Sequence, residues 1–307
     1  MAREVAAQHS PHTRHATRDT HNSVRPLVEE LLALLTWLRE WQLWAVLAFG
    51  IALWALAYTV PYQHELYFGG DRATERRHDD AAFLNIAEDG WDLAPEPASD
   101  AENTWLVSPA PPFRWAYDDA QLTLPGLGNG AWRVTILAAG QPTAGPTISR
   151  WSDGTYTSTV ALEQEPRAFQ HVFATDARGD LRLHFLTPPF TPPDDPRPLG
   201  FVGFSALVSS VGPQAIPLPQ LLYLAVCLTI CYGTARRLVF APHSALAVSV
   251  ALSLLLALAL ARWRIHLTGI TPVLATMLAT CYPLGALIAR GTNRVVRGQD
   301  ALSPQPS

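Results

Sequence analysis

The sequence contains no lysine, so all 22 of its basic residues are arginines. Because alanine and proline are also abundant, we interpret this bias as a property of the coding sequence and assign it no function. The formal net charge is only −4, and no basic stretch is long enough to follow a phosphate backbone. These absences exclude nucleic acid as an expected partner.

Cysteine is nearly absent as well. All three cysteines, Cys227, Cys231 and Cys281, lie in apolar segments, and residues 62–216 contain none, so no disulfide framework can hold that region. Cys227 and Cys231 are four residues apart and would share one face of a helix. No histidine or third thiolate is placed to complete a tetrahedral site, so we expect apolar packing residues, with no metal and no other cofactor.

Acidic residues are missing from four long apolar segments, which are predicted to be membrane spans. About 20 apolar residues cross the ~30 Å hydrocarbon core of a bilayer. The first segment lacks the short basic region and cleavage site of a removable signal peptide, so it should remain as an anchor. The absence of acidic residues disfavours proton-coupled transport and catalysis within the membrane. The expected transmembrane helices are residues 41–61, 217–235, 244–261 and 267–289.

Arginines flank these segments unevenly, which predicts the orientation of the chain in a cell membrane. Ten lie on the flanks assigned to the cytoplasm and five on the opposite flanks, so both termini are expected to be cytoplasmic and residues 62–216 extracytoplasmic. The ten are Arg3, Arg14, Arg18, Arg25, Arg39, Arg236, Arg237, Arg290, Arg294 and Arg297, and the five are Arg72, Arg76, Arg77, Arg262 and Arg264.

The two ends of the chain are polar. Residues 1–23 are predicted to be a disordered cytoplasmic tail, and residues 290–307 a second cytoplasmic tail. Between the first tail and the first span, residues 24–40 place leucines on one stripe, which is typical of an amphipathic helix at the membrane interface. Four histidines of the first tail could recruit a metal, but solvated side chains are the better interpretation; they are His9, His12, His15 and His21.

Residues 62–213 have the pattern of an extracytoplasmic all-β domain. Leu122 and Leu124 alternate with polar neighbours, a glycine-rich turn follows at 125–130, and apolar residues then alternate over 132–136, which predicts a hairpin. Similar short alternating runs separated by polar turns predict a sandwich or jelly roll; they are 155–163, 169–175, 181–186 and 199–210.

Two stretches of this domain are less regular. The many prolines of 187–198 cannot donate hydrogen bonds to a sheet ladder, so an extended edge or loop is expected there. Residues 64–112 mix glycine, aspartate and isolated apolar residues, which indicates one or two edge strands and long loops.

Three stretches, "GGDRATERRHDDAAFL", "FRWAYDDAQLTLPGLGNG" and "PPFTPPDDPRPLGFVGF", follow one span and precede a helical bundle. Over about residues 41–290, this arrangement resembles the front part of bacterial integral-membrane proteins of the GT-C glycosyltransferase type with an inserted galactose-binding-like sandwich. The resemblance implies polyprenyl-phosphate sugars and an acidic catalytic residue in the first outer loop. That loop offers Asp71, Asp79 and Asp80, for which solvated carboxylates are the better interpretation, and this chain has four expected spans where those enzymes have eight or more.

Two groups of residues are candidates for binding. Aromatic side chains of the β domain either form a stacking platform for a sugar ring or fill the core; they are Trp91, Trp105, Trp115, Tyr117 and Trp151. Arg262, Trp263 and Arg264 fall in the outer turn between the last two spans. They are expected either to anchor that turn at the bilayer interface or to bind an isoprenoid phosphate.

The sequence therefore predicts a noncatalytic membrane protein whose outer sandwich binds glycan or another envelope component. Two alternatives stay open: a GT-C-like glycosyltransferase relative or fragment, and a structural subunit of a larger membrane complex. The expected partners are the lipid bilayer, an envelope glycan or polyprenyl-phosphate lipid, and a membrane protein.

Overall fold

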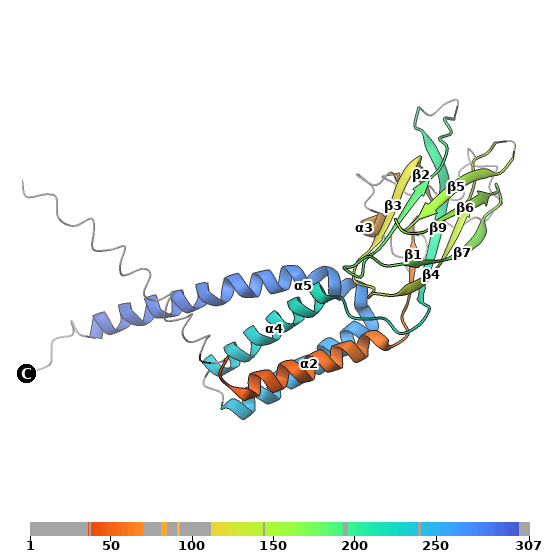
Figure 1. The fold of residues 1–307 in the computed structure, drawn as a ribbon. Helices are drawn as coiled ribbons and strands as arrows, with labels where there is room; N and C mark the ends of the chain where they lie inside the picture. Colours follow the sequence, from red (N-terminus) through yellow and green to blue (C-terminus); the bar gives the residue numbers. More distant parts are fainter. Residues whose placement is uncertain are drawn as a thin grey trace, which may run out of the picture.

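The computed structural model describes residues 36, 38–69, 81–84, 91–92, 112–143, 145–192, 196–238 and 241–300, with side chains described as far as residue 282. Figure 1 shows a β-sandwich at one end of the molecule and long helices at the other. Several predictions concern residues outside this described part, namely 1–23, nearly all of 24–40, residues 301–307, Asp71, Asp79, Asp80 and Trp105.

Within the described residues, three helices are long and apolar enough to cross a membrane, judged by length and composition. They are α2 (Trp41–Thr59), α4 (Leu218–Arg237) and the Pro242–Tyr282 part of α5 (Pro242–Asp300). The first two agree with the predicted spans 41–61 and 217–235. A proline in the first turn of α4 suits a position where the backbone N–H has no helical partner.

The long helix α5 reverses direction at Trp263, whose backbone is not helical (φ −129°, ψ 42°). Figure 1 shows two legs that run in opposite directions beside α2 and α4. The predicted spans 244–261 and 267–289 lie in these two legs, so four apolar segments occur within three helices. The second leg continues to Asp300, and the predicted tail is therefore helical as far as that residue. No proline follows until residue 304 to end the helix.

Two antiparallel sheets form the sandwich, as the alternating runs predict. The five-stranded sheet has the order β1-β9-β4-β7, with β2 also paired to β9, and the four-stranded sheet has the order β3-β8-β5-β6. The first sheet consists of β1 (Gln63–Tyr67), β2 (Arg114–Tyr117), β4 (Ala131–Ala139), β7 (Arg167–Ala174) and β9 (Leu199–Ser210). The second consists of β3 (Asp119–Leu124), β5 (Thr147–Ser152), β6 (Thr157–Leu162) and β8 (Leu181–Leu186).

The hairpin predicted around residues 125–130 is wrong. Strand β3 pairs with β8, whereas β4 pairs with β7 and β9, so the turn carries the chain from one sheet to the other. The six-residue turn is longer than the two-residue connections that specify a tight hairpin. The alternating apolar residues of both strands instead meet between the sheets, where Leu122 and Trp132 are fully buried.

Candidate functional site

Trp91, Trp115 and Trp151, three of the candidates for a sugar-stacking platform, fill the core instead. Trp91 and Trp151 have no exposed surface, and Trp115 is 5% exposed. Three phenylalanine rings stand 5.1 to 6.0 Å from the Trp91 ring. The indole N–H of Trp91 donates to the Gln121 carbonyl (3.0 Å), and that of Trp151 donates to Ser149 Oγ (2.9 Å). Both polar edges are thereby satisfied, and none of these three rings offers a face to a sugar.

Tyr117 lies half-buried in a polar cluster. Its hydroxyl donates to Asp92 Oδ1 (3.1 Å), and Arg197 Nη1 lies 2.5 Å from the same oxygen. Burial raises the pKa of Tyr117, and the Asp92 carboxylate raises it further. The buried guanidinium of Arg114 donates to the Asp92 carbonyl (2.9 Å). These contacts fix the Tyr117 hydroxyl between β2 and the chain around Asp92.

Arg264 is a buried clamp, which corrects its expected role at a lipid phosphate. Its guanidinium donates to Leu127 O and Ala57 O, both at 3.0 Å, and lies 4.4 Å from the centroid of the Tyr58 ring. The last carbonyls of a helix lack helical donors and carry partial negative charge, so a cation at the end of α2 is stabilising there. Arg264 thus joins α5, the end of α2 and the 125–130 turn.

The two residues before Arg264 differ from it. Trp263 is 58% exposed, and Arg262 is exposed as well. An exposed tryptophan and arginine at a helix turn have the composition of an interfacial anchor. Of the three residues that the sequence grouped together, two point to solvent and one points into the protein.

The glycine-rich turn lies against the helix ends. At Gly126 (φ +63°), a Cβ atom would stand 2.0 Å from Thr268 Cγ2, and at Gly128 (φ +103°) it would stand 2.7 Å from the Tyr58 ring. The Tyr58 hydroxyl donates to the Gly126 carbonyl (3.1 Å). Only glycine combines this backbone conformation with such a close approach. Ile265 of α5 also belongs to the buried sandwich core, so the sandwich and the helices share apolar packing.

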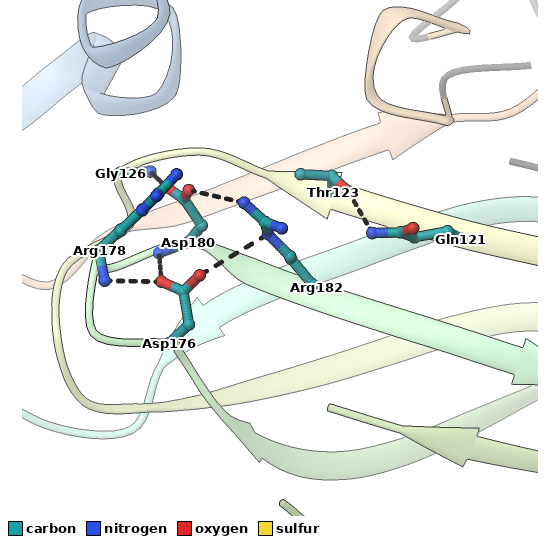
Figure 2. A network of polar contacts seen from close by, with 7 residues as sticks. All are labelled: Gln121, Thr123, Gly126, Asp176, Arg178, Asp180 and Arg182. Atoms are coloured by element: carbon teal, nitrogen blue, oxygen red, sulfur yellow. Dashed lines mark hydrogen bonds and ion pairs between the residues drawn. The ribbon is translucent and has the colours of Figure 1, made fainter. Parts of the chain in front are cut away.

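A polar network holds the same turn from the side of the β7–β8 connection, as Figure 2 shows. Asp180 Oδ1 accepts the backbone N–H of Gly126 (2.8 Å), and Asp176 Oδ1 accepts those of Arg178 (2.8 Å) and Asp180 (3.0 Å). Arg182 Nε and Nη2 lie 3.6 Å and 3.7 Å from Asp176 and Asp180 respectively. These carboxylates are therefore occupied by backbone donors and serve turn geometry.

Two histidines that the sequence did not single out also lie at this junction. The rings of His64, on β1, and His266, on α5, are 5.7 Å apart, and both face Phe83 at 6.2 Å. Burial lowers the pKa of His64, and the charges of His266 and Arg262 lower it further. At neutral pH the imidazole of His64 is therefore favoured in its uncharged form.

The opposite end of the four-stranded sheet carries an open groove. Strand β3 pairs Leu124 with Leu181 beside the glycine turn and Asp119 with Leu186 at its far end, so the groove lies at the end away from the helices. Its volume is about 370 Å³, and its lining consists of Asp118, Ile148, Arg150, Leu186, Thr187, Pro188 and Pro189. This size falls within the usual range of small-ligand sites.

The groove combines exposed charges with exposed aliphatic surface. Ile148 is 45% exposed and Leu186 52% exposed. Asp118 and Arg150 are exposed, and within the described part of the chain the Arg150 side chain has no hydrogen bond or ion pair. The floor is fixed, because the Thr187 hydroxyl lies 2.8 Å from that of Ser149. An anion can be bound by the guanidinium while an apolar face rests on the aliphatic chains.

The sequence gives no sign of this groove, because the strand β5 that forms one side of it has a weak sequence pattern. The short run "TISRWS" alternates buried and exposed residues, with Ile148 and Arg150 exposed and Thr147, Ser149 and Trp151 buried. Its buried positions are mostly polar, so the usual apolar signal of a strand is weak. The pairing of Arg150 with Leu186 could not be inferred from either segment alone.

No family model matches this chain, and no curated protein matches it either. Among solved structures, the CBM35 from Cellvibrio japonicus Abf62 is similar at 12% identity and TM-score 0.26, covering 48% of this chain and 92% of that one. The plant peptide RALF23 complex with FER and LLG2 gives 13% identity and TM-score 0.33, with 48% of each chain covered. The family GH115 4-O-methyl-alpha-glucuronidase BtGH115A gives 10% identity and TM-score 0.25; the alignment covers 33% of this chain and only 14% of that enzyme.

Proposed function

We propose that this chain is a noncatalytic integral membrane protein whose outer β-sandwich binds a glycan of the cell envelope. The observation that carries the proposal is the groove at Asp118 and Arg150. It has charged groups for hydroxyl or acidic substituents and aliphatic surface for the C–H faces of a sugar ring. It also lies at the end of the sandwich away from the helices, where a long polymer can reach it.

The apolar helices and the residues at the α5 turn support the membrane part of the proposal. The three apolar helices have the length and composition of spans, and the exposed Trp263 and Arg262 would lie at the headgroup level of the outer leaflet.

The glycosyltransferase alternative stays a prediction, because Asp71, Asp79 and Asp80 lie outside the described residues.

A retention assay tests the binding proposal. The full chain, purified in detergent, is passed over immobilised polysaccharide extracted from the envelope of its own cells. Arg150→Ala should weaken retention roughly tenfold, since hydrogen bonds to a charged group contribute about 1.5–3 kcal/mol. Arg133→Ala is the matched control, because Arg133 is an exposed arginine on the other sheet. Equal retention of all three proteins, or none by the wild type, contradicts the proposal.

A further inference from the structure

A second hollow lies among the helices and is almost entirely apolar. It has a volume of about 450 Å³ and is lined by one face of α4 and by both legs of α5. Along α4 its lining begins at Leu224 and ends at Leu238, while Val248 and Leu274 represent the two legs. We name this space the α4–α5 channel. The groove at Asp118 and Arg150, which we call the distal groove, shares no lining residue with the channel.

The cross-section of the α4–α5 channel can be compared with that of a hydrocarbon chain and that of a helix. From Leu224 to Leu238 the α-helical rise of about 1.5 Å per residue gives a length of ~21 Å. Dividing the volume of about 450 Å³ by this length leaves a mean cross-section of roughly 21 Å². A methylene chain whose neighbours stand ~4 Å away needs roughly 15–20 Å². A helix about 10 Å across needs roughly 80 Å², so the channel is too narrow for a helix and wide enough for a hydrocarbon chain.

A cation lies at the end of the channel away from the sandwich. Arg237 directly precedes Leu238, and its guanidinium carbon stands 5.1 Å from the centroid of the Tyr282 ring, one turn beyond the lining residue Leu278. The neighbouring Arg236 joins α4 to the start of α2, because its Nη2 forms an ion pair with Glu40 (3.0 Å). An apolar channel that ends beside an exposed arginine matches an amphiphile with a hydrocarbon chain and an anionic headgroup.

We propose that the α4–α5 channel binds one acyl chain of an anionic phospholipid, with the lipid phosphate at Arg237. The inference rests on the membrane insertion in the proposed function and is independent of glycan binding. The headgroup lies in the leaflet away from the sandwich, which is the inner leaflet for an outer sandwich. The acyl chain covers the apolar surfaces of α4 and of both α5 legs.

Lipid retention by the purified full chain tests the site. The delipidated protein is incubated in mixed micelles of phosphatidylglycerol or phosphatidylcholine, washed, and analysed for lipid bound per protein. We expect about one phosphatidylglycerol per chain and about a fivefold preference over phosphatidylcholine, the value for one arginine near an anionic surface. Arg237→Gln should abolish the preference. Equal retention of both lipids by the wild type overturns the proposal.

Two channel-filling variants and one control locate the bound chain. Val248→Trp and Leu274→Trp insert bulk from the two legs and should each remove the retained lipid, whereas Leu255→Trp should keep it, because Leu255 is 63% exposed and outside the lining. A thermal melt of each variant checks folding. Lipid retained by both filled variants overturns the proposal, as does a partner helix or second copy that dissociates from them in place of lipid.

The outcomes separate the two proposals. If alkaline carbonate extracts the wild-type chain from membranes, the shared premise of membrane insertion fails. If the chain stays inserted and retains glycan but no phospholipid, only the channel proposal fails. If it retains phospholipid but no glycan, only the glycan proposal fails.

Discussion

The two ends of the sandwich use similar residues for opposite purposes. At the end beside the helices, charged groups are committed to the protein: Arg264 donates to carbonyls, and Asp180 accepts a backbone N–H. At the far end, Asp118 and Arg150 are exposed beside aliphatic surface. Asp118 Oδ1 accepts the N–H of the adjacent Asp119 (3.1 Å), whereas the Arg150 side chain has no hydrogen bond or ion pair within the described part of the chain. Residue type alone therefore does not reveal a binding site, because a charged side chain can bind a ligand only where the protein has not already paired it.

The sandwich core between the two ends should be the most sensitive to substitution. Trp151→Ala removes a fully buried ring, and truncation of a buried tryptophan costs about 3–5 kcal/mol. Tyr156→Ala is the control, because Tyr156 is 55% exposed. Denaturant unfolding in detergent measures both. Equal free energies of unfolding for the two variants would show that Trp151 is not a core residue.

The junction end should come next. Arg264→Met leaves the carbonyls of Ala57 and Leu127 without this donor, and an unsatisfied buried acceptor costs about 1–3 kcal/mol. We expect a loss of about 3 kcal/mol in the free energy of unfolding. Arg262→Met, at an exposed position two residues before Arg264, should change the free energy of unfolding little. Equal unfolding free energies for the two variants would show that Arg264 does not stabilise the junction.

A pair of glycines separates close packing from backbone strain at the junction. Gly126 and Gly154 both have positive φ (+63° and +88°), but only Gly126 has a neighbour, Thr268, within reach of a Cβ. Each glycine-to-alanine change should cost about 1–3 kcal/mol for the left-handed backbone, and Gly126→Ala should cost more because Thr268 must move. Thermal melts of the two variants give the difference. No difference would mean that the turn is not pressed against α5.

Asp153, in the turn that follows β5, offers a pH test of the sandwich fold. Burial opposes its ionisation, but backbone N–H groups of Tyr156, Ala174 and Thr155 outweigh burial and lower the pKa of the carboxyl. A depressed folded-state pKa stabilises the protein above the unfolded value of about 3.9 and loses that contribution as pH falls through the folded value. The stability difference between the wild type and Asp153→Asn should therefore shrink below about pH 4. A difference independent of pH would contradict these hydrogen bonds.

The smallest effect on stability should come from the distal groove. Arg150→Ala removes an exposed side chain without a hydrogen bond or ion pair in the described part of the chain, so the free energy of unfolding should change by no more than about 0.5 kcal/mol. The same variant should lose most of its glycan retention. A large loss of stability would show that Arg150 supports the fold. The charged groups at both ends would then serve the protein's own structure.

Local patterns predicted the elements well where one physical signal dominated. Residues 199–210 and 181–186 alternate or are apolar throughout, and they form β9 and β8 with those bounds. The apolar length of 41–61 predicted α2. Strand β5 was missed because its buried positions include Thr147 and Ser149, which carry no apolar signal.

Side-chain periodicity and segment length are local properties, so the amino-acid pattern alone specifies an alternating β region between long apolar segments. Which polar groups are already paired depends instead on the folded structure. It paired β3 with β8 rather than β4, buried Trp151 and Arg264, and left Arg150 exposed beside Leu186. These outcomes depend on contacts between segments far apart in the chain, and no local pattern encodes such contacts.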